Sequence, residues 1–190
     1  GVAAAMVEQL AETPRADREV DADPRALFLC SEDTRLHLET RAFLRTLTEV
    51  GYTPTCTMND AAEALPRCDA LIHFGHGSDT ALSGRWQTYF TADEIPALPR
   101  GPIAFVDGCA TTPPGSPLLR AFMDRGGTAY IGSSSNVAGM IPARYACELI
   151  LHFLSRLAER PDTAIAELLR QARRDYVRAR PRLMDVLPEL

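Results

Sequence analysis

The sequence lacks cysteine pairs at the short spacing that metal-binding motifs use. No Cys-x-x-Cys occurs, and the number of cysteines is odd, so the pattern favours neither a disulfide framework nor a zinc knuckle. A reducing compartment is therefore expected. The five cysteines lie far apart, at Cys30, Cys56, Cys68, Cys109 and Cys147.

Long apolar runs are also missing. No run approaches the roughly 20 residues of a membrane-spanning helix, and the first ten residues lack the basic leader and apolar stretch of a signal peptide. We therefore expect no membrane partner and a cytoplasmic location. Because residue 1 is not methionine, we also expect the chain to belong to a longer, multidomain protein.

Lysine is absent, and all 20 basic residues are arginine, which we attribute to genome composition. The formal net charge is -5, which argues against nucleic acid as the main partner. Neither internal repeats nor low-complexity segments occur. A chain of 190 residues with 46% apolar and 24% charged residues can form one globular domain with a substantial core.

Short apolar runs alternate with stretches of helical periodicity. The runs predict strands over 26–30, 52–58, 69–74, 102–108 and 128–135. Helices are predicted over 2–12, 35–51, 60–68, 91–98, 116–127, 141–159 and 162–180. This order predicts an α/β fold, a three-layer sandwich whose mainly parallel central sheet is flanked by helices. The domain should span 25–182, after an N-terminal helix and connector (1–24) and before a tail (183–190).

Two of the predicted strands end in residues that can perform chemistry. The 69–74 run continues as Gly-His-Gly, and the 102–108 run is followed by cysteine. Ligands bind beyond the carboxyl ends of parallel strands, so His76 and Cys109 should meet at one edge if the strands are neighbours. Cys109 can then act as a nucleophile, and His76 can accept its proton or protonate a leaving amine. The backbone N–H groups of Gly77 and Cys109 are candidate donors to an oxyanion.

These blocks, in this order, resemble the caspase-like cysteine peptidases, and among them the gingipain-type branch. The similar segments are HFGHGSDTALSGRW, IAFVDGCATT, LLRAFMDRGGTAYIGSSSNV and AIAELLRQARRDYV, within about residues 25–178. The resemblance implies a caspase-like fold, a His76–Cys109 dyad and a peptide or protein substrate. It also implies that Ser133 and Ser134, after the fifth strand, help to form one wall of the substrate cleft; otherwise this segment is only a flexible turn.

Two histidines compete for the catalytic role. Residues three apart on a strand face opposite sides, so we expect His73 to pack under a helix and His76 to lie at the edge. A His-x-x-His pair on a strand cannot easily share a metal ion, and only Cys109 lies near as a third ligand. We therefore predict that no metal and no organic cofactor is needed.

An acidic residue precedes the cysteine by two positions. Asp107 and Cys109 should face the same side of their strand, which would put a carboxylate in the pocket for the residue before the cut bond. Arginine is its natural partner, and the resemblance adds Glu32 and Asp33 as a second source of acid. The alternative is that Asp107 caps a turn or pairs with a structural arginine. Trp86 likewise either lines a subsite or covers an apolar edge.

The sequence therefore predicts a cysteine endopeptidase that cleaves after Arg or Lys. One alternative is an acyl-transfer or thioester-processing enzyme that uses the same dyad, because a fold does not determine a function. The other is a caspase-like interaction module, in which Cys109 would be an ordinary buried thiol.

Overall fold

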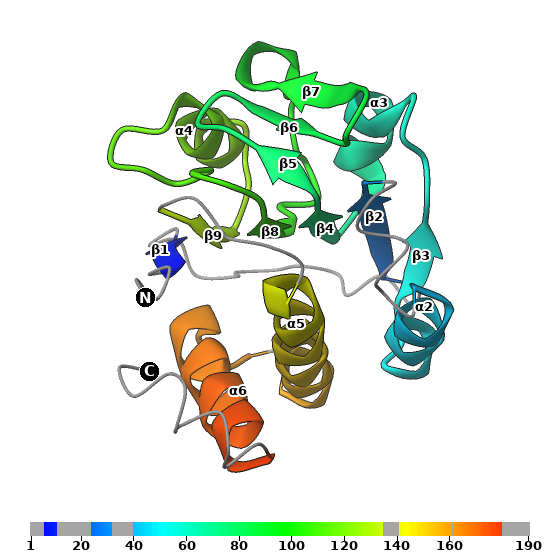
Figure 1. Cartoon of the computed structure of the whole chain (residues 1–190). Helices are drawn as coiled ribbons and strands as arrows, with labels where there is room; N and C mark the ends of the chain where they lie inside the picture. Colours follow the sequence, from blue (N-terminus) through cyan, green and yellow to red (C-terminus); the bar gives the residue numbers. More distant parts are fainter. Residues whose placement is uncertain (1–5, 11–23, 32–39, 135–140, 161, 180–190) are drawn as a thin grey trace.

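A computed structural model describes residues 6–10, 24–31, 40–134, 141–160 and 162–179. Its central feature is a six-stranded sheet of order β1-β9-β8-β4-β2-β3 (Figure 1). The strands are β1 (Met6–Leu10), β2 (Arg25–Cys30), β3 (Thr53–Thr55), β4 (Ala70–Phe74), β8 (Ile103–Asp107) and β9 (Ala129–Ser133). Neighbouring strands are parallel, except that β1 runs antiparallel to β9.

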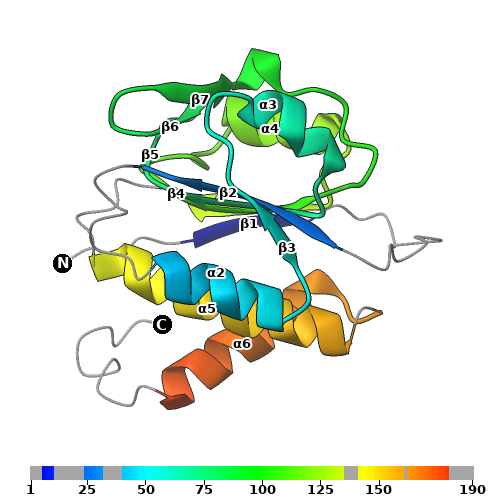
Figure 2. The same ribbon diagram turned by 90° about the vertical axis from the view of Figure 1, so that its right-hand side faces the viewer.

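Helices cover both faces of this sheet. Figure 2 shows α2 (Thr40–Glu49), α5 (Ile141–Glu159) and α6 (Ile165–Ala179) on one side, with α3 (Ala61–Ala64) and α4 (Pro117–Asp124) on the other. The predicted α/β architecture, with a mainly parallel central sheet flanked by helices, is confirmed. No helix among the described residues is both long and apolar enough to cross a membrane.

The central strands are buried on both faces, as their continuous apolar runs predict. In β4, Ile72 and Phe74 pack in the core beneath α2 and α5, whereas Leu71 packs in the opposite core with α3 and α4. All five residues of β4 are buried. The two cores fix the sheet from both sides, so the carboxyl ends of β4 and β8 are held in register.

A second, three-stranded sheet lies above the carboxyl edge and was not predicted. It has the order β5-β6-β7 and is antiparallel. Its strands are β5 (His76–Gly77), β6 (Ala81–Ser83) and β7 (Thr88–Thr91). The buried side chains of Leu82 and Phe90 attach it to the core on the α3–α4 side. Its strands have two to four residues, too few for a clear alternation of apolar and polar positions.

The helix predicted over 2–12 is wrong for Met6–Leu10, which form strand β1. Every residue of β1 pairs with β9, from Met6 opposite Ser133 to Leu10 opposite Ala129. Without β1, the backbone of β9 would be an open sheet edge, and this tertiary pairing outweighs a weak local preference for helix. The rest of the N-terminal connector, 11–23, and the tail, 183–190, lie outside the described residues.

Two further predictions are correct in position but not in length. The helix predicted over 60–68 is α3 followed by a 3₁₀ turn, η1 (Leu65–Arg67). The helix predicted over 91–98 is reduced to the 3₁₀ turn η2 (Ala92–Glu94), which begins with a capping box between Thr91 and Glu94. Prolines at 66 and 96 interrupt both segments, because proline cannot donate the backbone hydrogen bond of a helix interior.

Candidate functional site

The carboxyl ends of β4 and β8 lie side by side. Phe74 is paired with Asp107, and the N–H of Gly75 donates a hydrogen bond of 3.0 Å to the carbonyl of Asp107. His76 lies two residues beyond Phe74, and Cys109 lies two residues beyond Asp107. Each candidate catalytic residue therefore lies two residues beyond the end of one of two neighbouring strands, at the same edge of the central sheet. The His76 side chain is exposed and Cys109 is half-buried.

The backbone N–H of Gly77 faces this edge. In the β5–β6 ladder the N–H of Ser78 donates to the carbonyl of Ala81, and bonded pairs alternate along antiparallel strands. The pair formed by Gly77 and Leu82 is therefore not hydrogen-bonded, and the Gly77 N–H points away from β6. A Cβ built on Gly108 would lie 3.4 Å from this nitrogen. The amide thus lies against the segment that carries Cys109, as expected for a candidate oxyanion donor.

The backbone turns sharply directly after Cys109. Ala110 has a φ angle of 46°, and among the described residues it is the one non-glycine residue with a positive φ. This left-handed conformation costs an L-residue about 1–2 kcal/mol. Strain of this kind is concentrated at functional sites, where surrounding contacts maintain it. The strained turn therefore directly follows Cys109, which itself lies two residues beyond the end of β8.

His73 is fully buried, as predicted, but the small sheet covers it instead of a helix. Its Nε2–H donates to the carbonyl of Ser83 at 3.2 Å, and its ring meets the ring of Tyr89 edge-on at 5.7 Å. Among the described residues, Nδ1 has no hydrogen-bond partner. Burial lowers the pKa of His73 to about 4. His73 is therefore a neutral core residue, and His76 is the histidine that reaches the edge.

The buried imidazole should make the fold sensitive to acid. Below pH 6.5 an unfolded chain binds a proton at His73, whereas the folded protein does so only near pH 4, so stability falls as the pH falls between these values. The free energy of unfolding falls by about 3 kcal/mol at most. His73→Gln, which keeps a donor but does not titrate, should flatten the pH dependence of urea unfolding measured between pH 7.5 and 5. Equal pH dependence in both proteins would contradict this assignment. His73→Ala should be less stable than the wild type at pH 7.5, because it leaves a cavity.

Asp107 is half-buried, and its carboxyl has no compensating cation among the described residues. Within the described part of the chain, no side chain donates a hydrogen bond to it or forms an ion pair with it. By contrast, the carboxylate of Asp69 accepts hydrogen bonds from the guanidinium of Arg100 at both of its oxygens. Burial raises the pKa of Asp107 to about 6. The alternative that Asp107 pairs with a structural arginine therefore finds no partner in the described residues.

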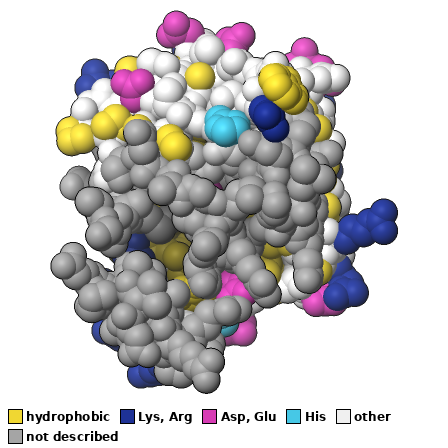
Figure 3. All heavy atoms as spheres, in the orientation of Figure 1, with side chains coloured by type: hydrophobic (Ala, Val, Ile, Leu, Met, Phe, Trp, Pro, Cys, Tyr) yellow, Lys and Arg dark blue, Asp and Glu magenta, His cyan; other side chains and the backbone are white. Residues whose placement is uncertain are grey.

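Trp86 is 76% exposed at the turn between β6 and β7 and so does not cover an apolar edge. The guanidinium of Arg85 lies 4.7 Å from the centre of its ring. Figure 3 shows one face of the molecule, on which a histidine side chain lies close to a basic and a hydrophobic side chain. An exposed aromatic ring in this position is available to contact an extended ligand.

The segment after β9 is described only in part. Ser133 is buried, its N–H donates to Thr111 Oγ1 at 3.3 Å, and its carbonyl accepts a bond of 2.8 Å from the N–H of Thr112. Ser134 is half-buried. The remainder of the predicted cleft wall, 135–136, lies outside the described residues, as do Glu32 and Asp33.

The other described cysteines differ from Cys109 in their surroundings. Cys30 and Cys68 are buried, and burial raises the pKa of Cys68 to about 11, which suppresses its thiolate. Cys56 is exposed directly after the edge strand β3, and strands β2 and β4 lie between β3 and β8. The side chain of Cys147 is not described. No three His, Cys, Asp or Glu side chains in the described ranges are grouped as a metal site requires.

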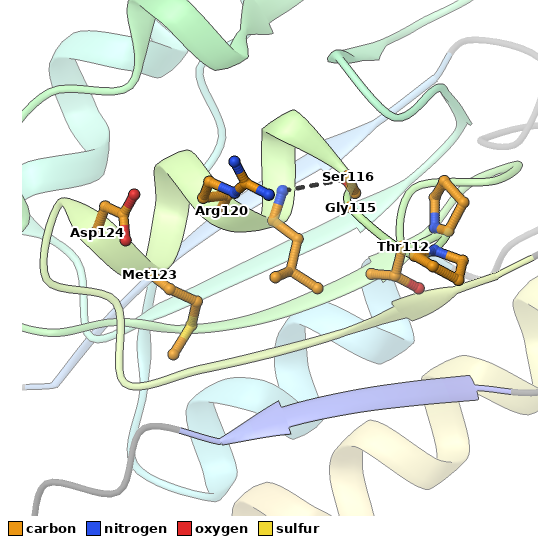
Figure 4. A pocket seen from close by; sticks show the side chains of 9 residues that line it. Thr112, Gly115, Ser116, Arg120, Met123 and Asp124 are labelled. Carbon is orange, nitrogen blue, oxygen red and sulfur yellow. Dashed lines mark hydrogen bonds between the residues drawn. The ribbon is translucent and has the colours of Figure 1, made fainter.

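A pocket of about 380 Å³ is formed by helix α4 and the loop before it (Figure 4). It is lined by Thr112, Pro113, Pro114, Gly115, Ser116, Leu119, Arg120, Met123 and Asp124. Figure 4 shows the hydrogen bond from the N–H of Leu119 to Ser116, which caps α4 as the Ser-Pro sequence predicts. The lining of this pocket therefore comes from the loop after Cys109 and from α4, and it includes neither His76 nor Cys109.

Sequence reasoning missed Thr111, which packs directly against the candidate oxyanion donor. A Cβ built on Gly77 would lie 2.5 Å from Thr111 Cγ2, closer than real atoms approach. The only signal in the sequence was a polar Thr-Thr pair after the cysteine, and such pairs are usually exposed.

Comparison of the chain with known protein families, with curated proteins and with solved structures found no match.

The close contact predicts that Gly77→Ala displaces the Gly77 amide. We expect kcat for any acyl substrate to fall by about 100-fold, the usual effect of losing one oxyanion donor. Gly51→Ala is the matched control, because Gly51 has a φ of 93° at the end of α2 with open space around it. That variant should lose about 1 kcal/mol of stability and keep its turnover. Equal kcat values for the two variants would contradict the prediction.

Proposed function

We propose that this chain is the catalytic domain of a caspase-like cysteine peptidase, related to the gingipain-type branch. One observation carries the proposal: β4 and β8 are parallel neighbours with Phe74 opposite Asp107, and His76 and Cys109 each follow two residues later at that edge. The amide of Gly77, directed at the segment carrying Cys109, and the strained turn at Ala110 support it. The mainly parallel sheet between helices agrees with the sequence resemblance.

In the proposed reaction, the Sγ thiolate of Cys109 attacks the carbonyl carbon of a peptide bond. The carbonyl oxygen takes the negative charge and accepts hydrogen bonds from the N–H groups of Gly77 and Cys109. The C–N bond then breaks, and His76 gives its proton to the leaving amine. Water, deprotonated by His76, attacks the resulting thioester, and the carboxylic acid product leaves as the Cys109 thiolate and protonated His76 are restored.

We further propose that the substrate carries Arg or Lys immediately before the cut bond. The support is Asp107, a half-buried carboxyl without a compensating cation among the described residues. A cationic substrate side chain would supply the missing partner, and arginine can bind such a carboxylate with two hydrogen bonds. Trp86, Ser133 and Ser134 are proposed to contact the peptide on either side, with Glu32 or Asp33 adding a second acid.

A panel of peptide amides and peptide thioesters with Arg, Lys, Ala, Gln or Asp before the scissile bond tests this function. We expect hydrolysis of the Arg and Lys amides, and covalent labelling of Cys109 by an arginyl peptide ketone, found by mass spectrometry. Turnover of thioesters without turnover of any amide would replace the peptidase by an acyl-transfer enzyme. If neither labelling nor turnover occurs, the interaction module is the better description.

A further inference from the structure

Thr111 is a fully buried polar residue two positions beyond Cys109. It directly follows Ala110, the residue with a positive φ in the turn after Cys109. Buried polar residues need partners for their hydrogen-bonding groups. The contacts of Thr111 therefore indicate which parts of the molecule it joins.

The methyl group of Thr111 fills space that two glycines leave open. A Cβ on Gly77 would lie 2.5 Å from Cγ2, and a Cβ on Gly108 would lie 3.4 Å from it. The same methyl thus packs against the backbone that precedes Cys109 and against the backbone that carries the Gly77 amide. It acts as a spacer between the two segments that bear the proposed oxyanion donors.

The polar groups of Thr111 attach it to further segments of the same rim. Oγ1 accepts a bond of 3.3 Å from the N–H of Ser133 at the end of β9, and the carbonyl accepts one of 2.9 Å from Ser116 Oγ. The same Oγ lies 3.2 Å from the carbonyl of Asp79, two residues beyond Gly77. Hydroxyl, carbonyl and methyl therefore hold Thr111 in one orientation.

We propose that Thr111 is a positioning residue whose methyl group sets the separation of the Gly77 and Cys109 amides, and with it the geometry of the oxyanion site. This inference rests on the proposed function. A displacement of about 1 Å in such a site can cost about 100-fold in rate. The methyl and the hydroxyl have separable tasks: the methyl positions the donors, and the hydroxyl holds the end of β9.

Two substitutions separate these tasks. Thr111→Ser removes the methyl and keeps the hydroxyl, whereas Thr111→Val keeps a methyl and removes the Oγ1 that accepts from the N–H of Ser133. We expect Thr111→Ser to lower kcat for an arginyl peptide amide by about 10- to 100-fold with KM changed less than about threefold. Thr111→Val should keep kcat within about threefold of the wild type while lowering the melting temperature.

Two reagents distinguish an effect of Thr111→Ser on the oxyanion site from an effect on the nucleophile Cys109. Iodoacetamide alkylates Cys109 by displacement at a saturated carbon and forms no oxyanion, so its rate should be unchanged in Thr111→Ser. A peptide aldehyde forms a hemithioacetal whose oxygen occupies the oxyanion site, so its affinity should fall by a factor similar to that for kcat. Equal losses in alkylation and in turnover would overturn the proposal, as would a Thr111→Ser variant with wild-type kcat.

A spectroscopic readout keeps this inference separate from the peptidase proposal. The amide NMR signals of Gly77 and Cys109 should shift in Thr111→Ser, whereas Thr111→Val should mainly shift the amide of Ser133. If the wild type hydrolyses no peptide, the proposed function fails, and the amide shifts alone decide the role of Thr111. Unshifted Gly77 and Cys109 amides in Thr111→Ser would overturn it in either case.

Discussion

Replacing Cys109 with alanine should abolish peptide hydrolysis while the protein keeps its fold. The thiol is half-buried beyond the end of β8, so its loss leaves no large cavity in either core. His76→Ala should lower kcat by about 100- to 10,000-fold, the range for loss of a general acid–base group. The His76 side chain is exposed, so this variant should unfold at the wild-type temperature. Turnover of an arginyl peptide amide and thermal unfolding are the two measurements.

Matched variants make these results specific. Cys56→Ala removes another accessible thiol and should keep full turnover. His73→Ala should lower the melting temperature, since its ring is buried against Tyr89 and bonded to Ser83. If His73→Ala abolished turnover at an unchanged melting temperature, the catalytic role would belong to His73 and not to His76. Wild-type turnover in Cys109→Ala would exclude covalent catalysis by this residue.

The central sheet could be predicted because its signal is local. The strands β2, β4, β8 and β9 are continuous apolar runs between polar turns, and burial on both faces is what such runs require. Strand β1 could not be predicted, because it is a strand only through its pairing with β9. Its own residues alternate too little to distinguish it from a helix.

The positions of His76 and Cys109 could be predicted by counting residues beyond two strand ends. Their joint position depends on β4 and β8 being neighbours, which the sequence left as a condition and the observed register meets. The covering of His73 could not be predicted, because the β5–β7 sheet consists of short strands. Thr111 was missed for a different reason: its burial results from contacts with Gly77, Ser133 and Ser116, which come from three separate segments.

Asp107→Asn should make the folded protein more stable at neutral pH. Burial raises the pKa of this carboxyl to about 6 from about 4, so the folded state binds the proton more tightly than the unfolded chain between these values. Stability therefore falls as the pH rises through this window, by at most about 3 kcal/mol. The variant should gain stability at pH 7.5 and lose that advantage at pH 4, as measured by urea unfolding. An unchanged or lower stability at pH 7.5 would show that the carboxylate has stabilising partners.

The same substitution should remove the preference for basic substrates, which explains why a destabilising carboxyl would be retained. An ion pair made with a desolvated carboxylate is worth about 2–5 kcal/mol, so the wild type should prefer arginine to its neutral isostere citrulline by at least about 30-fold in kcat/KM. Because only the ionised form pairs with a cation, this ratio should increase as the pH rises through about 6. Taking the ratio cancels every pH dependence of the chemical step that the two substrates share. In Asp107→Asn the ratio should fall close to one at every pH, while iodoacetamide still alkylates Cys109 at the wild-type rate. Equal wild-type turnover of arginine, alanine and aspartate substrates would refute the assignment of Asp107 to the specificity pocket.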